Sequence, residues 1–157
     1  MNEMDIREVK TKTVMPEASS ATVRGWSLDV SERTLVGLKG ADAQDLLQRL
    51  STNDVSRLTV GGTIQTVLTN EKGRMIEVLS VLMPVENKLL LVGQSSDAEG
   101  LGRWLDKFII MEDAKVEPLS SAYAHYIVYD IDSVHDVTQS LTIPAGTLIW
   151  EEEWGGT

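Results

Sequence analysis

The sequence predicts an α+β fold, an antiparallel sheet with helices on one face. Two segments, 41–50 and 101–110, place apolar residues at the i, i+3, i+4, i+7 spacing of one helix face. Between them, residues 63–69, 75–83 and 88–92 are rich in β-branched and aliphatic side chains. The turns that join these strands are short, which makes the strands antiparallel neighbours. The expected order of elements is therefore β-α-β-β-β-α-β.

The first helix follows a short apolar run at residues 35–38, which predicts a strand. Its apolar face consists of residues at helical spacing: Ala43, Leu46, Leu47 and Leu50. Thr52, Asn53 and Asp54 follow the helix, and their side chains favour caps and turns. We therefore expect the chain to turn there.

A hairpin is predicted next. Residues 70–73, Asn-Glu-Lys-Gly, form its turn, in which Gly73 is free to take a positive φ. The following strand, 75–83, is apolar except for Glu77 and Ser80. Residues 84–87 predict a second turn, which leads into the strand at 88–92.

Asp97 is expected to cap the second helix. The apolar stripe of that helix consists of Leu101, Trp104, Leu105 and Phe108. Because each stripe needs cover, we expect both helices to pack on the same side of the sheet. A further strand is predicted at residues 114–119.

Three regions are expected along the chain. Residues 1–24 are polar and weakly patterned, which predicts a loosely ordered N-terminal arm. Residues 25–120 form the main α+β domain. Residues 121–157 predict a short β-α-β unit packed on the same domain, with a helix that begins near Asp132 or Ser133 and a last strand at 146–150.

Composition narrows the classes of function. The 157 residues carry a formal charge of −10, which argues against binding to nucleic acid or to an anionic membrane surface. No apolar run is long enough to span a bilayer, so we expect a soluble, cytoplasmic protein. The chain has no cysteine, which excludes disulfides and cysteine-held metals. His125 and His135 are too few and too far apart in sequence to predict a metal site.

Three motifs occur in a characteristic order: G-x-D-A-x-x-L-L-Q-x-L at residues 40–50, Thr-Asn-Asp-Val at 52–55, and Thr-Asn-Glu-Lys-Gly-Arg at 69–74. Together they resemble the folate-binding domain of the glycine-cleavage T-protein (aminomethyltransferase) and of YgfZ-type proteins. The resemblance covers roughly residues 28–120. It implies a shortened form of that domain, with tetrahydrofolate or a related folate as the ligand.

The resemblance gives Glu77 a possible role in ligand binding. The matching strand of aminomethyltransferases carries two adjacent aspartates, one of which is thought to act beside the reacting nitrogen of tetrahydrofolate. Here the two positions are Glu77 and Val78, whose side chains should face opposite ways. We align the catalytic aspartate with Val78, which implies that the catalytic acid is absent. The alternative for Glu77 is a solvent-open place on the sheet or a pair with Arg74.

The other candidate binding residues follow from the same resemblance. Gln94 offers a donor and an acceptor to a pterin edge, with Val92 as an apolar wall beside it and Leu79 as another. Thr52, Asn53 and Asp54 would lie near the folate pocket. The alternatives are that Gln94 is an ordinary loop residue and that residues 52–54 only form the turn.

Two hypotheses about function follow. In the first, the chain is a folate-binding accessory protein without aminomethyl transfer activity. In the second, it has lost the small-molecule site and is a protein-interaction or self-association module. The YgfZ-type motif K-G-C-x-x-G-Q-E has no counterpart here, and family members are usually longer. We expect the missing segments to leave a sheet edge or an apolar face uncovered, which predicts a homodimer.

Overall fold

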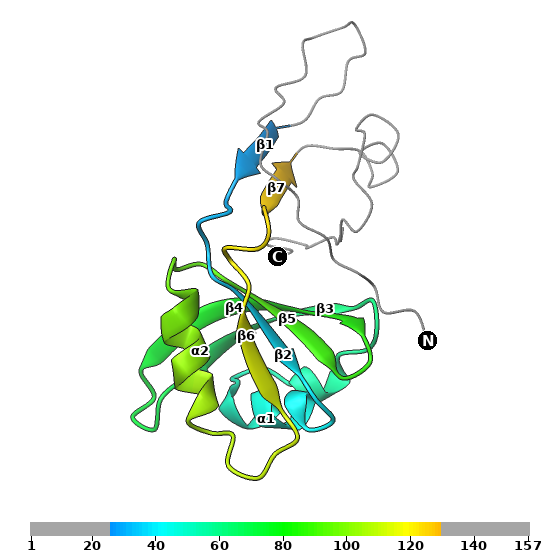
Figure 1. Cartoon of the computed structure of the whole chain (residues 1–157), viewed down its shortest axis with the longest axis vertical. Coiled ribbons are helices and arrows are strands. Elements are labelled where there is room, and N and C mark those ends of the chain that lie inside the picture. The colour runs from blue at the N-terminus through cyan, green and yellow to red at the C-terminus, as the bar shows by residue number, and fades with distance from the viewer. Residues whose placement is uncertain (1–25, 130–157) are drawn as a thin grey trace, which may run out of the picture. The chain divides into compact units, whose positions relative to one another are not determined.

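A computed structural model describes residues 26–129, which divide into two compact units (Figure 1). The smaller unit contains β1 (Trp26–Asp29) and β7 (Tyr126–Tyr129), which pair antiparallel. The larger unit comprises residues 32–121. Residues 26–31 therefore group with residues 122–129 in the smaller unit. The predicted arm at 1–24, the helix near 132–133 and the strand at 146–150 lie outside the described residues.

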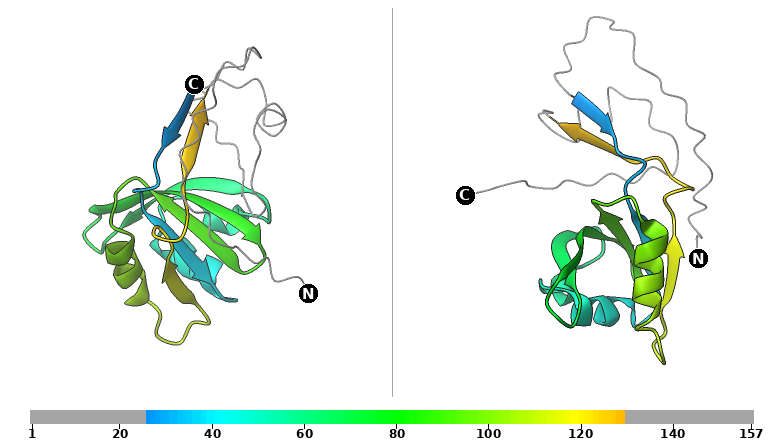
Figure 2. Two further views of the ribbon diagram at one scale, coloured as in Figure 1. Left: turned by 45° about the horizontal axis from the view of Figure 1, so that its top comes forward. Right: turned by 90° about the vertical axis from the view of Figure 1, so that its left-hand side faces the viewer.

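The larger unit is built on one antiparallel sheet of five strands in the order β3-β4-β5-β2-β6. Its strands are β2 (Leu35–Lys39), β3 (Thr63–Thr69), β4 (Met75–Val85), β5 (Lys88–Gly93) and β6 (Lys115–Pro118). Its helices are α1 (Ala43–Leu50), the short 3-10 helix η1 (Val55–Arg57) and α2 (Ala98–Asp106). The α+β prediction is confirmed. In Figure 2, α2 lies beside β6.

The β3–β4 hairpin has the predicted turn. The Asn70 side-chain oxygen accepts the N–H groups of Lys72 and Arg74, each at 3.0 Å. Gly73 has a φ of 70° and donates its N–H to the Asn70 carbonyl at 2.9 Å. β4 runs farther than expected, through Pro84 to Val85, so the next turn is shorter than the predicted 84–87. The register of β4 against β5 shifts between Leu82 and Val85, which accommodates the proline.

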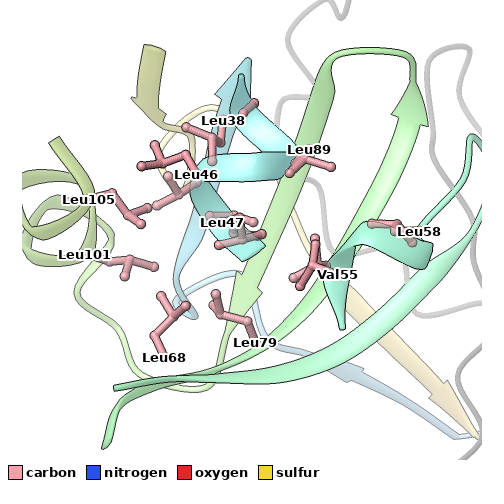
Figure 3. Packing of buried hydrophobic residues seen from close by; sticks show 14 of the residues in the cluster. Leu38, Leu46, Leu47, Val55, Leu58, Leu68, Leu79, Leu89, Leu101 and Leu105 are labelled. Atoms are coloured by element: carbon pink, nitrogen blue, oxygen red, sulfur yellow. The ribbon is translucent and has the colours of Figure 1, made fainter. Parts of the chain in front are cut away.

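The core confirms that both helices cover the same side of the sheet. Leu47 of α1 and Leu105 of α2 are fully buried in one cluster, together with Leu38, Leu68 and Leu79 of the strands (Figure 3). The Asp97 carboxylate accepts the Gly100 N–H at 2.7 Å, so the predicted cap of α2 is also confirmed. The sheet and both helices therefore share one hydrophobic core.

The second apolar stripe is shorter than predicted. α2 ends at Asp106, so Phe108 lies beyond the helix and is 37% exposed. Trp104 packs at the edge of the cluster, with its ring edge-to-face against Phe108 at 4.9 Å between centroids. The helix–sheet contact thus depends mainly on Leu101 and Leu105.

Replacing Leu105 by alanine should lower the free energy of unfolding by about 2–5 kcal/mol, because the side chain is fully enclosed and its removal leaves a cavity. Phe108→Ala should cost clearly less, since much of that ring remains in water. Urea denaturation followed by circular dichroism measures both changes. Equal losses for the two variants would contradict this packing.

Candidate functional site

Glu77 lies on the inward side of β4 and is only 7% exposed. Its Oε1 accepts the backbone N–H groups of Val78 at 3.0 Å, Gln94 at 3.1 Å and Ser95 at 3.4 Å. Its Oε2 accepts the Ser95 hydroxyl. Neither alternative from the sequence is correct, because the carboxylate is buried and has no Arg74 partner among the described residues. Burial of this charge is compensated by four donors instead.

The hydrogen bonds continue from Ser95 to the start of α2. The Ser95 and Thr34 hydroxyl oxygens lie 3.0 Å apart, and the Thr34 hydroxyl oxygen also accepts the Asp97 N–H at 3.1 Å. The Thr34 backbone pairs with this segment on both sides, accepting from Gly93 and donating to Ser95. Thr34 is fully buried. The result is a polar junction that joins β4, the end of β5 and α2.

The pleat of the sheet separates the candidate residues that the sequence placed together. Leu79 belongs to the core, on the same face as Glu77, and is 1% exposed. Val78 and Val92 alternate with these core positions and therefore face the opposite side of the sheet. Gln94 has an exposed side chain although its N–H is bound to Glu77.

Thr52, Asn53 and Asp54 lie along the outer edge of β3. The Thr52 N–H bonds to the Val67 carbonyl at 3.0 Å, and the Asn53 side-chain amide donates to the Gln65 carbonyl at 2.8 Å. β3 and β4 thus stand between this segment and Gln94. At the usual distance between neighbouring strands, the two places are roughly 14 Å apart.

A surface hollow of about 360 Å³ opens beside Asn53 and Asp54. Arg57, which has no ion pair with any described residue, also lines it. Glu77, Gln94 and Val92 do not line this hollow. The structure therefore offers two separate polar places, one at Gln94 and one at residues 53–57.

The turn between α2 and β6 carries none of the sequence motifs described above. Glu112 Oε2 accepts the N–H groups of Ile110 at 2.7 Å and Met111 at 3.0 Å, while Oε1 accepts Arg49 Nη2 at 2.9 Å. The Arg49 hydrogen bond, and then these N–H groups, lower the pKa of Glu112 from 4.5 to about 2. Arg49 also contacts Asp45 at 3.3 Å.

Two apolar side chains of this turn are exposed to solvent: Ile110 is 84% exposed and Met111 is 94% exposed. A further hydrogen bond connects the turn to the start of α1: the Asp42 carboxylate accepts the Asp113 N–H at 2.8 Å. At Gly40, whose φ is 132°, a Cβ would lie 2.0 Å from the Asp113 carbonyl oxygen, so only glycine fits there. The available sequence signal was the apolar run at residues 108–111, which lies between the end of α2 and the acidic pair Glu112–Asp113.

Comparison with known proteins decides the family. A family model described as the GCVT N-terminal domain matches residues 7–129. The aminomethyltransferase of Bacillus mycoides (strain KBAB4) is 34% identical over 120 residues, which are 76% of this chain and 32% of the relative. That of Bacillus pumilus (strain SAFR-032) is 33% identical over 116 residues, which are 74% of this chain and 32% of the relative. The chain belongs to the GCVT N-terminal domain family.

The fold of this GCVT-family chain also matches a solved structure. The glycine cleavage system aminomethyltransferase T from Bartonella henselae superposes with a TM-score of 0.57 at 21% identity, over 62% of this chain and 27% of that one. The resemblance drawn from the motifs is confirmed at the level of family and fold. The chain spans about a third of the length of the curated relatives that it matches.

Two further observations concern residues 26–129 alone. None of the helices described there has the length and apolar character needed to cross a membrane. The same residues hold no cluster of three or more histidine, aspartate or glutamate side chains suited to a metal ion.

Glu112 should make stability depend on pH. Its folded-state pKa of about 2 lies below the ordinary 4.5, so its contribution is present above about pH 4.5 and is lost as the pH falls towards 2. The urea midpoint of the unmodified chain should therefore fall more steeply over this range than that of Glu112→Gln. Glu71→Gln, which changes an exposed carboxylate in the β3–β4 turn, is the control and should keep the steeper fall. Parallel curves for Glu112→Gln and the unmodified chain would contradict the assignment.

Proposed function

We propose that this chain is a folate-binding accessory domain, with tetrahydrofolate or a related folate as its ligand. The observation that carries the proposal is its membership of the GCVT N-terminal domain family over residues 7–129, together with its similarity to aminomethyltransferases of two Bacillus species. The proposal concerns binding by this segment, since the chain spans about a third of those enzymes.

The ligand would contact the exposed side chain of Gln94. A glutamine amide both donates and accepts, which suits the edge of a pterin ring. Val78 and Val92 lie on the face of the sheet opposite the core cluster and would supply apolar contacts; Val78 is half-buried and Val92 is 8% exposed. Thr52, Asn53 and Asp54 would interact with a more distant part of an extended ligand, and Arg57 in the adjacent hollow could pair with a carboxylate there.

Aminomethyl transfer by this chain alone is not part of the proposal. Val78 stands at the position that we align with the catalytic aspartate, and a valine side chain cannot carry charge or exchange a proton. Glu77 does not replace it, because its side chain faces the core and its two oxygens already accept four hydrogen bonds. Binding without transfer is the function that these residues support best.

Isothermal calorimetry with tetrahydrofolate and with its 5-formyl form tests this function. Gln94→Ala should weaken binding by roughly tenfold, the effect of losing one or two hydrogen bonds to the ligand. Ser96→Ala changes an exposed side chain of the same loop and should leave binding unchanged. No heat with either folate at high protein concentration would refute the proposal.

A second candidate function, self-association, is favoured by the exposed turn at Ile110 and Met111. Hydrogen bonds to Glu112 hold the backbone of the turn, so the backbone would lose little conformational freedom when the apolar side chains are covered. The edges of the sheet are poor alternatives. Residues 51–53 bond to part of β3, and β6 carries Lys115, Glu117 and Pro118, which discourage strand pairing. The homodimer would therefore form through the turn.

Sedimentation velocity across the micromolar range tests the dimer. Replacing both Ile110 and Met111 by serine should shift the chain to monomer, because the apolar contact is removed. Val60→Ser, which changes another exposed apolar residue, should leave the dimer intact. A monomer at every concentration of the unmodified chain would exclude this function.

A further inference from the structure

The buried carboxylate of Glu77 lacks a cationic partner among the described residues, although ionised groups are usually buried only when they are paired. Three backbone N–H groups and one hydroxyl take the place of the cation. Two of those N–H groups belong to Gln94 and Ser95, just after β5 ends. The carboxylate therefore fixes the path of this loop.

Close packing at Gly93 shows how tightly the carboxylate lies against the loop. A Cβ at Gly93 would approach the Glu77 carboxyl carbon to 3.0 Å and the Thr34 Cβ to 2.9 Å, so a side chain here would displace one of them. From the other side, Thr34 holds Ser95 and Asp97. The backbone of Gln94 is thus fixed by its hydrogen bond to the buried Glu77 carboxylate, while its side chain remains exposed.

We propose that Glu77 is a positioning residue for ligand contact by Gln94 and does not itself touch the ligand. This inference rests on the proposed folate-binding function. Glu77 acts by accepting the Gln94 and Ser95 N–H groups, which fixes the backbone from which the Gln94 amide projects. A backbone ordered before binding lowers the entropy lost when the ligand arrives, and so raises affinity.

The role in positioning can be tested without any ligand. Amide hydrogen exchange should speed up at Gln94 and Ser95 in Glu77→Ala by about tenfold more than at Leu91, whose exchange reports opening of the core strand. Glu77→Gln keeps a carbonyl oxygen in place of Oε1 and should restore most of the protection. Glu86→Gln, which alters an exposed carboxylate in the β4–β5 turn, should show no change. Unchanged exchange at Gln94 and Ser95 in Glu77→Ala overturns the proposal.

Calorimetry with 5-formyltetrahydrofolate provides the second measurement. Glu77→Ala should weaken binding by up to about tenfold, no more than Gln94→Ala does, and Glu77→Gln should recover most of that loss. In addition, Glu77→Ala combined with Gln94→Ala should bind about as weakly as Gln94→Ala alone, because both changes remove the same contact. Additive losses, or a Glu77→Gln variant as weak as Glu77→Ala, would mean that Glu77 contacts the ligand directly and would overturn the proposal.

The two measurements separate this inference from the function on which it rests. No heat with the unmodified chain refutes folate binding, whatever the exchange data show. If Glu77→Ala fails to fold by circular dichroism, Ser95→Ala takes its place, since it removes only the hydroxyl donor to Oε2 and the contact with Thr34. Faster exchange at Gln94 in that variant supports positioning, and unchanged exchange overturns it.

Discussion

A carboxylate buried without a cation determines how β4, β5 and α2 meet. Glu77 accepts donors from its own strand and from the segment after β5, and Thr34 carries the connection on to the start of α2. A buried carboxylate without hydrogen-bond donors is costly, and so is a buried backbone N–H without an acceptor. Hydrogen bonds between Glu77 and these N–H groups remove both costs. The position of Gln94 follows from this arrangement.

The turn between α2 and β6 is built by the same chemistry. Glu112 accepts two backbone N–H groups of its own turn, and Asp42 accepts that of Asp113 across to the start of α1. Part of the acidic surplus of this chain therefore satisfies backbone donors in loops. Some of the carboxylates behind the charge of −10 thus have a structural role in these loops.

These two junctions bear on function in different ways. The junction at Glu77 lies within the residues that match the family and supports the loop that would meet a folate in the proposed function. The turn at Glu112 presents Ile110 and Met111, which a binding site for a small polar ligand does not require. Binding of a folate and self-association could therefore depend on separate parts of the same unit.

The sequence by itself determined the elements whose causes are local. Helical spacing located both helices, Asn70 and Gly73 located the hairpin turn, and Asp97 was recognised as a cap from its place before the apolar stripe. The motif order was sufficient for the family. Each of these signals arises from residues a few positions apart, so no knowledge of the tertiary structure was needed.

Only the tertiary structure decided the environment of Glu77, the exposure of Phe108 and the pairing of β1 with β7. The donors to Glu77 include groups 17 and 18 positions away along the chain, so its burial could not be inferred from β4 alone. Pleating then placed Glu77 and Val92 on opposite faces, although the motifs suggested one site. The face on which a side chain lies depends on strand register, and the environment of a buried charge depends on donors that are distant in sequence. Both are fixed only when the sheet is assembled.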